Sequence, residues 1–356
     1  MEDIYKQLAR ILDGIPEGYP ATDSGVELKI LAKLFTTEEA MLACHLELEP
    51  LSAGDVARRI GWEERHTFTL LKGMTKKGLI ETEKGEGGLR FKLMPFVVGF
   101  YEGQRARLDE EFAHLVETYY IEGFHKMMSV NPPIHRIIPI EEVIPVNLEV
   151  MPYERASAII ESAVSCGLMS CICRVQKNLV GQGCKSAIYN CLVFSSRVNA
   201  FENKDNFRTI TKEQAKEILA EAQRQGLVHS TRNVRQGVTY ICNCCTCCCA
   251  ILQGLAKYGH MNAVGKSDFM AALDQDMCSG CGLCTERCPF HALAMAEGVC
   301  ILDTTRCYGC GLCVSTCPTG ALTLNLKPGA QIQPPPVSES QWRKERFDAR
   351  KLSERD

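Results

Sequence analysis

Two stretches decide the fold of the C-terminal part of the chain: CSGCGLCTERCPFHAL (residues 278–293) and CYGCGLCVSTCPTGAL (residues 307–322). They align without a gap and lie twenty-nine positions apart (307 minus 278), so they are an internal duplication. Each copy has three cysteines at three-residue spacing and a fourth cysteine directly before a proline. One tight loop can offer three thiolates to a [4Fe-4S] cubane, whereas the fourth iron must be reached by another segment. The spacing therefore predicts two cubanes with crossed ligation.

The crossed pattern assigns eight cysteines to two ligand sets. The first cubane takes Cys278, Cys281, Cys284 and Cys317, and the second takes Cys307, Cys310, Cys313 and Cys288. Glycines next to the ligands allow backbone conformations in which amides donate to cluster sulfurs. The eight positions resemble those of two-cluster bacterial ferredoxins, which implies low-potential, one-electron transfer by each cluster. Paired zinc sites are the alternative, although zinc motifs do not usually repeat three evenly spaced cysteines plus Cys-Pro.

Length and composition limit the class of protein. The chain has 356 residues, which predicts two or more domains, and its net charge of -3 provides no overall attraction to nucleic acid or anionic lipid. No secretory signal or membrane-spanning apolar run is evident, so we expect a cytoplasmic protein without a membrane span. In that setting 21 cysteines favour metal thiolates over disulfides. Only Cys44 precedes residue 150, so metal binding is expected in the remainder.

Residues 166–249 contain eleven cysteines that the duplicated stretches do not use. We interpret Cys166, like Cys44 and Cys300, as an ordinary buried cysteine that packs as a small apolar residue. The other ten form two sets: Cys171, Cys173, Cys184 and Cys191, and the dense run Cys242, Cys244, Cys245, Cys247, Cys248 and Cys249. Neighbouring side chains of the dense run cannot all face one apolar core. The pattern therefore predicts one or two additional iron–sulfur clusters or another metal site.

The partition of these ten thiolates stays open at this point. In the simplest scheme each stretch holds its own cluster, and in a mixed scheme both stretches clasp one cluster between them. Arg174 and Lys185 could neutralise cluster charge or bind an anion, but solvated basic side chains are the default expectation. His229 could be a ligand, although a lone histidine after a helix is more often a surface or satisfied core residue.

The N-terminal part shows helical periodicity and no metal motif. Two helices are expected within residues 24–49, a helix-turn-helix within residues 51–77, and a hairpin after Gly78. The segment of residues 24–96 resembles a winged-helix domain. Glu63 and Glu64 at the start of its second helix oppose phosphate contacts, whereas lysines and arginines follow along the helix and hairpin. We therefore expect a structural or protein-docking winged helix rather than a DNA reader.

The remaining stretches complete the predicted organisation. Helices are expected over residues 102–128, 152–164 and 211–225, with Gly226 as a stop. The proline-rich tail is expected to be solvated or loosely docked, the alternative being a short helix anchored by Trp342 and Phe347. The predicted fold class is α+β multidomain, with the divisions 1–100 (winged-helix-like), 101–150 (helical and proline-rich connector), 151–265 (cysteine-rich), 266–326 (two-cluster ferredoxin-like) and 327–356 (proline-rich charged tail).

The order of these parts resembles a group of anaerobe-type proteins with a winged helix in front, a CxC and CNCC-type cysteine region in the middle, and a 4Fe-4S dicluster module behind. The resemblance implies no substrate. We expect an electron-transfer protein that passes single electrons through the two clusters to a further cysteine-ligated centre or a redox partner protein. The alternatives are a redox-responsive transcription regulator and an iron–sulfur oxidoreductase with its active centre in residues 166–249. The sequence predicts no catalytic residue and no oligomeric state.

Overall fold

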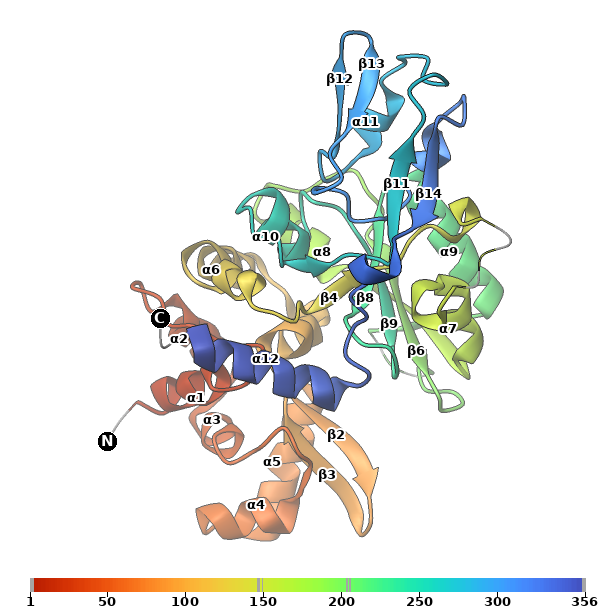
Figure 1. Cartoon of the computed structure of the whole chain (residues 1–356). Coiled ribbons are helices and arrows are strands. Elements are labelled where there is room, and N and C mark those ends of the chain that lie inside the picture. The colour runs from red at the N-terminus through yellow and green to blue at the C-terminus, as the bar shows by residue number, and fades with distance from the viewer. Residues whose placement is uncertain (1–2, 146–147, 149, 203, 205, 354–356) are drawn as a thin grey trace. The chain divides into compact units, whose positions relative to one another are not determined.

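A computed structural model describes residues 3–145, 148, 150–202, 204 and 206–353 (Figure 1). The described residues form a mixed α+β structure with several sheets. The chain divides into two compact units, one of residues 1–127 with 176–182, and one of residues 128–175 with 183–356. The five-part division expected from the sequence stays a prediction. Within the described ranges, no helix is long and apolar enough to span a membrane.

The first unit is mainly helical with one small antiparallel sheet of strand order β1-β3-β2. Its elements are α1 (Ile4–Asp13), α2 (Val26–Leu34), α3 (Thr37–Ala43), β1 (Leu51–Ser52), α4 (Ala53–Ile60), α5 (Glu64–Lys76), β2 (Ile80–Gly85), β3 (Gly88–Leu93) and α6 (Glu110–Glu122). The two helices expected within residues 24–49 and the hairpin after Gly78 are confirmed. The winged-helix assignment itself stays a prediction.

Local sequence explains the ends of these helices. Capping boxes start α3 at Thr36 and α4 at Ser52, because each hydroxyl accepts an amide hydrogen bond from an acidic residue three positions later. Gly61 ends α4 with a positive φ of 71°. The single helix expected over residues 102–128 is wrong. A helical turn at Glu102–Arg107 is followed by α6, which starts only after Asp109 caps it and ends at Gly123.

A seven-stranded sheet dominates the second unit, with strand order β10-β4-β8-β9-β6-β5-β7. All its neighbours are antiparallel except the pair β10 and β4. The strands are β4 (His135–Ile137), β5 (Ser165–Ser170), β6 (Tyr189–Ser195), β7 (Arg208–Ile210), β8 (Val228–Arg232), β9 (Tyr240–Cys244) and β10 (Val264–Gly265). Of the helices of this region, α7 (Ala156–Ser162), α9 (Lys212–Arg224) and α10 (Ala250–Ala256) belong wholly to this unit, whereas α8 (Ile172–Leu179) begins in it and its residues from Gln176 onward belong to the first unit.

The two faces of this sheet bury different side chains, because successive residues of a strand point to opposite faces. On β6, Leu192 and Phe194 belong to one apolar cluster together with residues of α7 and α9. Cys191 and Val193 belong to a separate cluster. Cys166 joins the aliphatic cluster of the α7 and α9 face, as expected for an ordinary buried cysteine.

Two helices in this unit differ from their predicted extents. The helix expected over residues 152–164 is interrupted, since a helical turn at Pro152–Glu154 is separated from α7 by the extended Arg155. The helix expected over residues 211–225 is confirmed as α9. Thr211 caps it, and Gly226 follows it with a φ of 77°.

The duplicated stretches lie between two paired strands, β11 (Phe269–Leu273) and β14 (Leu322–Leu326) (Figure 1). Between them are α11 (Leu283–Arg287) and the hairpin of β12 (Leu293–Ala296) and β13 (Val299–Leu302). The pairing joins the start and end of the duplicated region, because Phe269 lies opposite Leu326 and Leu273 opposite Leu322. Both cysteine loops are thus closed into one module.

The tail is docked on the second unit rather than solvated, so the default expectation for it is wrong. It forms α12 (Glu339–Ser353), and the last three residues of the predicted tail lie outside the described residues. Trp342 is fully buried and donates from Nε1 to the Pro133 carbonyl at 2.8 Å. Arg346, also fully buried, donates to the Pro132 carbonyl at 2.8 Å. Phe347, the second anchor of the alternative, is only half-buried.

Candidate metal centres

The first predicted ferredoxin set surrounds one small cavity. That cavity is lined by Cys278, Cys281, Cys284 and Cys317, so the cysteine of the second copy reaches the loop of the first. Its thiolates are the ligand type that holds iron in [4Fe-4S] clusters. The donor set therefore fits a cubane at this position, although the residue assignment itself stays a prediction.

The second predicted set is likewise brought together across the two copies. The Cys313 thiol interacts electrostatically with Cys310, Cys288 and Cys307, and all four are buried. Burial raises the pKa of Cys310 to about 12, so this thiol needs a bound cation to be ionised at neutral pH. A cluster supplies that positive charge. Backbone amides already point at two of the sulfurs, from Ala271 to Cys307 at 3.5 Å and from Ala292 to Cys288 at 3.3 Å.

Cys300 lies closer to the first set than the sequence indicated. It is buried on β13, and its Sγ is 3.5 Å from Sγ of the ligand candidate Cys284. Burial raises its pKa to about 12, which keeps it a neutral thiol at physiological pH. The interpretation of Cys300 as a buried apolar residue is therefore incomplete, since its sulfur accepts a hydrogen bond from the thiol of a ligand candidate. Cys300 lies on β13, outside the repeated cysteine spacing of the two copies, so that spacing did not identify it.

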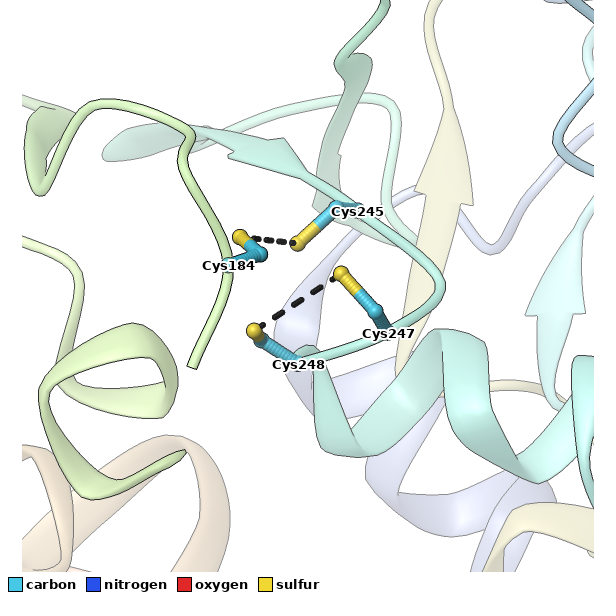
Figure 2. Close-up of side chains that lie close together, drawn as sticks. All are labelled: Cys184, Cys245, Cys247 and Cys248. Atoms are coloured by element: carbon cyan, nitrogen blue, oxygen red, sulfur yellow. Dashed lines mark hydrogen bonds between the residues drawn. The ribbon is translucent and has the colours of Figure 1, made fainter. Parts of the chain in front are cut away.

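A separate group of four cysteines lies in the middle region: Cys184, Cys245, Cys247 and Cys248. Their four sulfur atoms are all within 4.8 Å of one another, with Cys184 and Cys245 at 3.9 Å and Cys247 and Cys248 at 3.7 Å (Figure 2). Figure 2 shows the four side chains converging from two segments, the loop after α8 and the loop between β9 and α10. Cys248 is buried and Cys247 is exposed, so the group opens to solvent on one side.

The spacing of this four-cysteine group fits a bound metal. A single ion with metal–sulfur bonds of about 2.3 Å holds tetrahedral thiolates about 3.8 Å apart, close to the two observed contacts. A cubane binds each thiolate to a different iron, so its ligands must stand further apart, and the solvent-open side leaves room for that spread. The group could therefore hold an additional cluster or one ion.

A hydrogen bond and a nearby positive charge favour the thiolate form of one member of this group, which favours metal binding. The pKa of Cys245 falls to about 5, because the Cys248 thiol donates to it and the guanidinium of Arg174 lies close by. Cys245 is consequently a thiolate at neutral pH, the form that ligates metals. Burial and the neighbouring Cys245 raise the pKa of Cys247 to about 12, so its proton must leave when a metal enters.

Arg174 is not the solvated side chain of the default expectation, because it is only 1% exposed. It donates to the Asn190 side chain at 2.9 Å and to the Asn243 carbonyl at 2.8 Å. Although burial opposes ionisation, the nearby Cys171, Cys245 and Cys244 raise the pKa of Arg174, so it stays charged. The sequence signal for its place in the site was its position directly after Cys173 of the CxC pair. Lys185 is exposed, as expected.

His229 occupies a satisfied core position. It is buried on β8, and its Nδ1 lies 2.6 Å from the Asn243 side-chain oxygen. The amide of Asn243 in turn donates to the Asn190 carbonyl at 2.6 Å. These contacts fix Asn243 within the CNCC run, and so position the backbone from which the neighbouring cysteines project. Sequence reasoning did not identify Asn243, although its place inside the CNCC run marked it.

The ten cysteines of the middle region combine across the two stretches. Cys184 of the first stretch joins Cys245, Cys247 and Cys248 of the second. Cys171, Cys173 and Cys191 contact the remaining three, Cys242, Cys244 and Cys249. This is the geometry of a mixed scheme, in which neither stretch by itself surrounds a site. The assignment of individual ligands stays a prediction.

Comparison with known proteins identifies the C-terminal module. Residues 277–321 match the family described as the 4Fe-4S dicluster domain. The match spans both cysteine loops and ends one residue before β14. No curated protein matches the chain. The chain therefore carries an iron–sulfur dicluster domain, together with a four-cysteine group that could hold an additional cluster.

Proposed function

We propose that this protein transfers single electrons through two [4Fe-4S] clusters to a further cysteine-ligated centre in the middle region. The dicluster domain supports the donor side of the proposal, because each such cluster carries one electron. The four-cysteine group supports an acceptor side outside that domain. The dicluster domain and the four-cysteine group belong to the same compact unit, as electron transfer between them requires.

A short backbone connection carries this proposal. The amide of Ile140 donates to the carbonyl of Cys310, a ligand candidate of the second cubane, at 2.9 Å. Two residues earlier, the amide of Ile138 donates to the carbonyl of His229 on β8, also at 2.9 Å. His229 is paired in the sheet with Asn243 of the CNCC run. The path from this ligand candidate to the cysteine-rich strand thus consists of two hydrogen bonds, one sheet pairing and one short segment.

We expect anaerobically purified protein to accept more than two electrons per chain. The two cubanes accept about one electron each, and a redox-active middle centre accepts at least one more. The measurement is a titration with reduced methyl viologen, followed by visible absorption and combined with iron analysis. Iron above about eight atoms per chain agrees with a filled middle region. Uptake of only two electrons, with zinc in the four-cysteine group, would contradict the proposal because zinc has no redox chemistry.

For the first unit we expect only weak, salt-sensitive DNA binding. The Glu63 carboxylate caps α5 and accepts hydrogen bonds from the amides of Arg65 and His66. An acidic group thus occupies the helix terminus where a phosphate would bind. Fluorescence anisotropy with random duplexes at two salt concentrations tests this. Tight binding to one sequence at physiological salt, altered by cluster oxidation, would favour the transcription-regulator alternative instead.

A further inference from the structure

We infer that six other cysteines, Cys171, Cys173, Cys249, Cys244, Cys242 and Cys191, form a second metal centre in the middle region and hold an iron–sulfur cluster there. This six-cysteine ring shares no residue with the four-cysteine group. The inference concerns what the ring binds, and it holds whether or not electrons reach the ring from the dicluster domain.

The six thiols interact with one another in a closed circuit. Cys171 pairs with Cys173 and with Cys191, and Cys173 pairs with Cys249. From Cys249 the circuit continues to Cys244, then to Cys242, and returns to Cys191. Each thiol therefore has two thiol neighbours. A circuit of six sulfurs offers more ligands than one four-coordinate ion can use.

The sheet explains why three of these cysteines meet. Leu192 on β6 lies opposite Ile241 on β9, so the next pair in this antiparallel register is Cys191 and Cys242. Cys244 is two residues beyond Cys242 on the same strand and points to the same face. This face of the sheet points away from α7 and α9. Cys166 lies on the other face, in the apolar cluster that includes residues of these two helices. Alternation along the strands thus separates the ring cysteines from the ordinary buried cysteine.

The other three ring cysteines come from the ends of the adjoining segments. Cys171 follows β5 directly and its amide donates to the Ile188 carbonyl at 2.7 Å, which holds it beside β6. Cys173 lies in the first turn of α8, and Cys249 directly precedes α10. Three strands and two helices therefore converge on the ring. Met169, Val193 and Phe201 pack in one cluster with Cys171 and Cys191, so the ring borders apolar side chains.

Polar groups around the ring face its sulfurs. The Ser230 hydroxyl lies 3.6 Å from the Cys244 sulfur. The backbone amide of Arg174 is directed at the sulfur of Cys171. Donors aimed at thiolates stabilise negative charge and tune a bound cluster. A set of neutral cysteines in an apolar core would need none of them.

Arg174 provides evidence for a bound cluster that is independent of the contacts among the six thiols. Its charged side chain, 1% exposed, interacts with Cys171 and Cys244 of the ring and with Cys245 of the four-cysteine group. Its Nε–H is buried and has no hydrogen-bond partner among the residues that the structure describes. A buried donor without an acceptor destabilises the folded protein. A sulfur atom of a bound cluster is an acceptor that would remove this destabilisation, and a cluster with four thiolate ligands carries the negative charge that Arg174 would balance.

The chemistry of the donor set selects the type of metal. Thiolates favour soft metals, chiefly zinc, copper(I) and iron–sulfur clusters. Zinc and copper(I) take at most four thiolates on one ion, whereas a cluster distributes its ligands over several metal atoms. The same chain already carries a dicluster domain. We therefore assign an iron–sulfur cluster to the ring.

The test begins with a variant that empties the four-cysteine group and spares the ring. Cys184→Ser with Cys247→Ser changes two residues that are not buried, so the fold should be retained. Iron, zinc and acid-labile sulfide are counted per chain after anaerobic purification, and Mössbauer spectra identify the iron. We expect iron and sulfide to stay above the roughly eight atoms that two cubanes contain. A fall to about eight irons, or zinc in place of the additional iron, would overturn the inference.

A second variant, Cys173→Ser, then removes a half-buried ring member. We expect it to lose the additional iron and to keep both cubanes reducible by dithionite, as judged by their electron paramagnetic resonance signals. Cys166→Ser is the matched control, because it alters a buried cysteine of the same sheet that lies outside the ring. Equal iron in Cys173→Ser and in the unaltered protein would contradict the inference, as would equal losses in Cys173→Ser and Cys166→Ser. These outcomes are separate from the electron count that tests the proposed function.

Discussion

Gly309→Ala is expected to abolish assembly of the cubane held by the second set, a loss of about four irons per chain. A Cβ atom at position 309 would lie 2.1 Å from the Phe269 carbonyl oxygen and 2.2 Å from the Ser267 hydroxyl. The Ser267 hydroxyl donates to the Gly309 carbonyl at 2.9 Å, so the loop and β11 cannot separate without losing that bond. The neighbouring ligand candidates Cys307 and Cys310 would be displaced with the loop.

Gly282→Ala is the matched control for this prediction. Both glycines have a positive φ, 71° at Gly309 and 75° at Gly282, so alanine pays a similar conformational cost of roughly 1–2 kcal/mol at each. At Gly282, however, no atom lies within 4 Å of the added Cβ. Iron and sulfide analysis with electron paramagnetic resonance of the reduced protein distinguishes the two. Retention of both cubanes in Gly309→Ala, or equal loss in Gly282→Ala, would show that the close approach to β11 does not matter.

The duplication supplies an internal repeat of this test. Gly280 occupies the position in the first copy that Gly309 occupies in the second, and its added Cβ would lie 2.2 Å from the Gly298 carbonyl oxygen. Gly280→Ala should therefore remove the first cubane by the same mechanism. Each loop of the dicluster domain thus depends on one glycine that contacts a carbonyl of another segment.

Trp342→Ala is expected to destabilise the second unit by about 3–5 kcal/mol, the usual cost of removing a buried tryptophan. The indole is fully buried, its Nε1 donates to Pro133, and the guanidinium of Arg232 lies 3.7 Å above the ring. Arg232 also forms an ion pair with Glu339 at the start of α12. Loss of the indole should release α12 from residues 132–133 and from β8.

Phe347→Ala provides the control on the same helix, because Phe347 is only half-buried and its ring contacts Lys351 of α12 itself. Thermal unfolding and hydrogen exchange over residues 339–353 are the measurements. Trp342→Ala should lower the unfolding midpoint and expose the amides of α12, while Phe347→Ala should change either by much less. Equal effects of the two substitutions would mean that α12 is not anchored through its tryptophan.

The dicluster domain could be located from the sequence because its information is local. Cysteines at three-residue spacing recur in two copies about thirty residues apart, and this spacing alone predicts two clusters with crossed ligation. What the spacing did not reveal is Cys300, which pairing of β12 with β13 brings 3.5 Å from Cys284. A residue outside the motif becomes part of the environment of the cluster only when the chain folds back.

The middle region shows the opposite case. Its cysteine content indicated metal, but the grouping of the thiols depends on pairing between β6 and β9, which are separated by more than forty residues. Register and strand alternation direct Cys191 and Cys242 to one face and Cys166 to the other. Spacing along the chain contains no information about strand pairing. The two schemes for grouping the ten middle cysteines therefore could not be distinguished from the sequence.

The sequence by itself determined that this chain carries a 4Fe-4S dicluster domain and where that domain lies, and the density of the middle cysteines predicted a further metal site. Only the tertiary structure decided which middle cysteines meet, that Arg174 is buried among them, and that the tail docks through Trp342. The physical reason is the range of the interactions. Loop ligation and helix capping act between near neighbours, whereas sheet register and the burial of a charge or an indole depend on segments that only folding brings together.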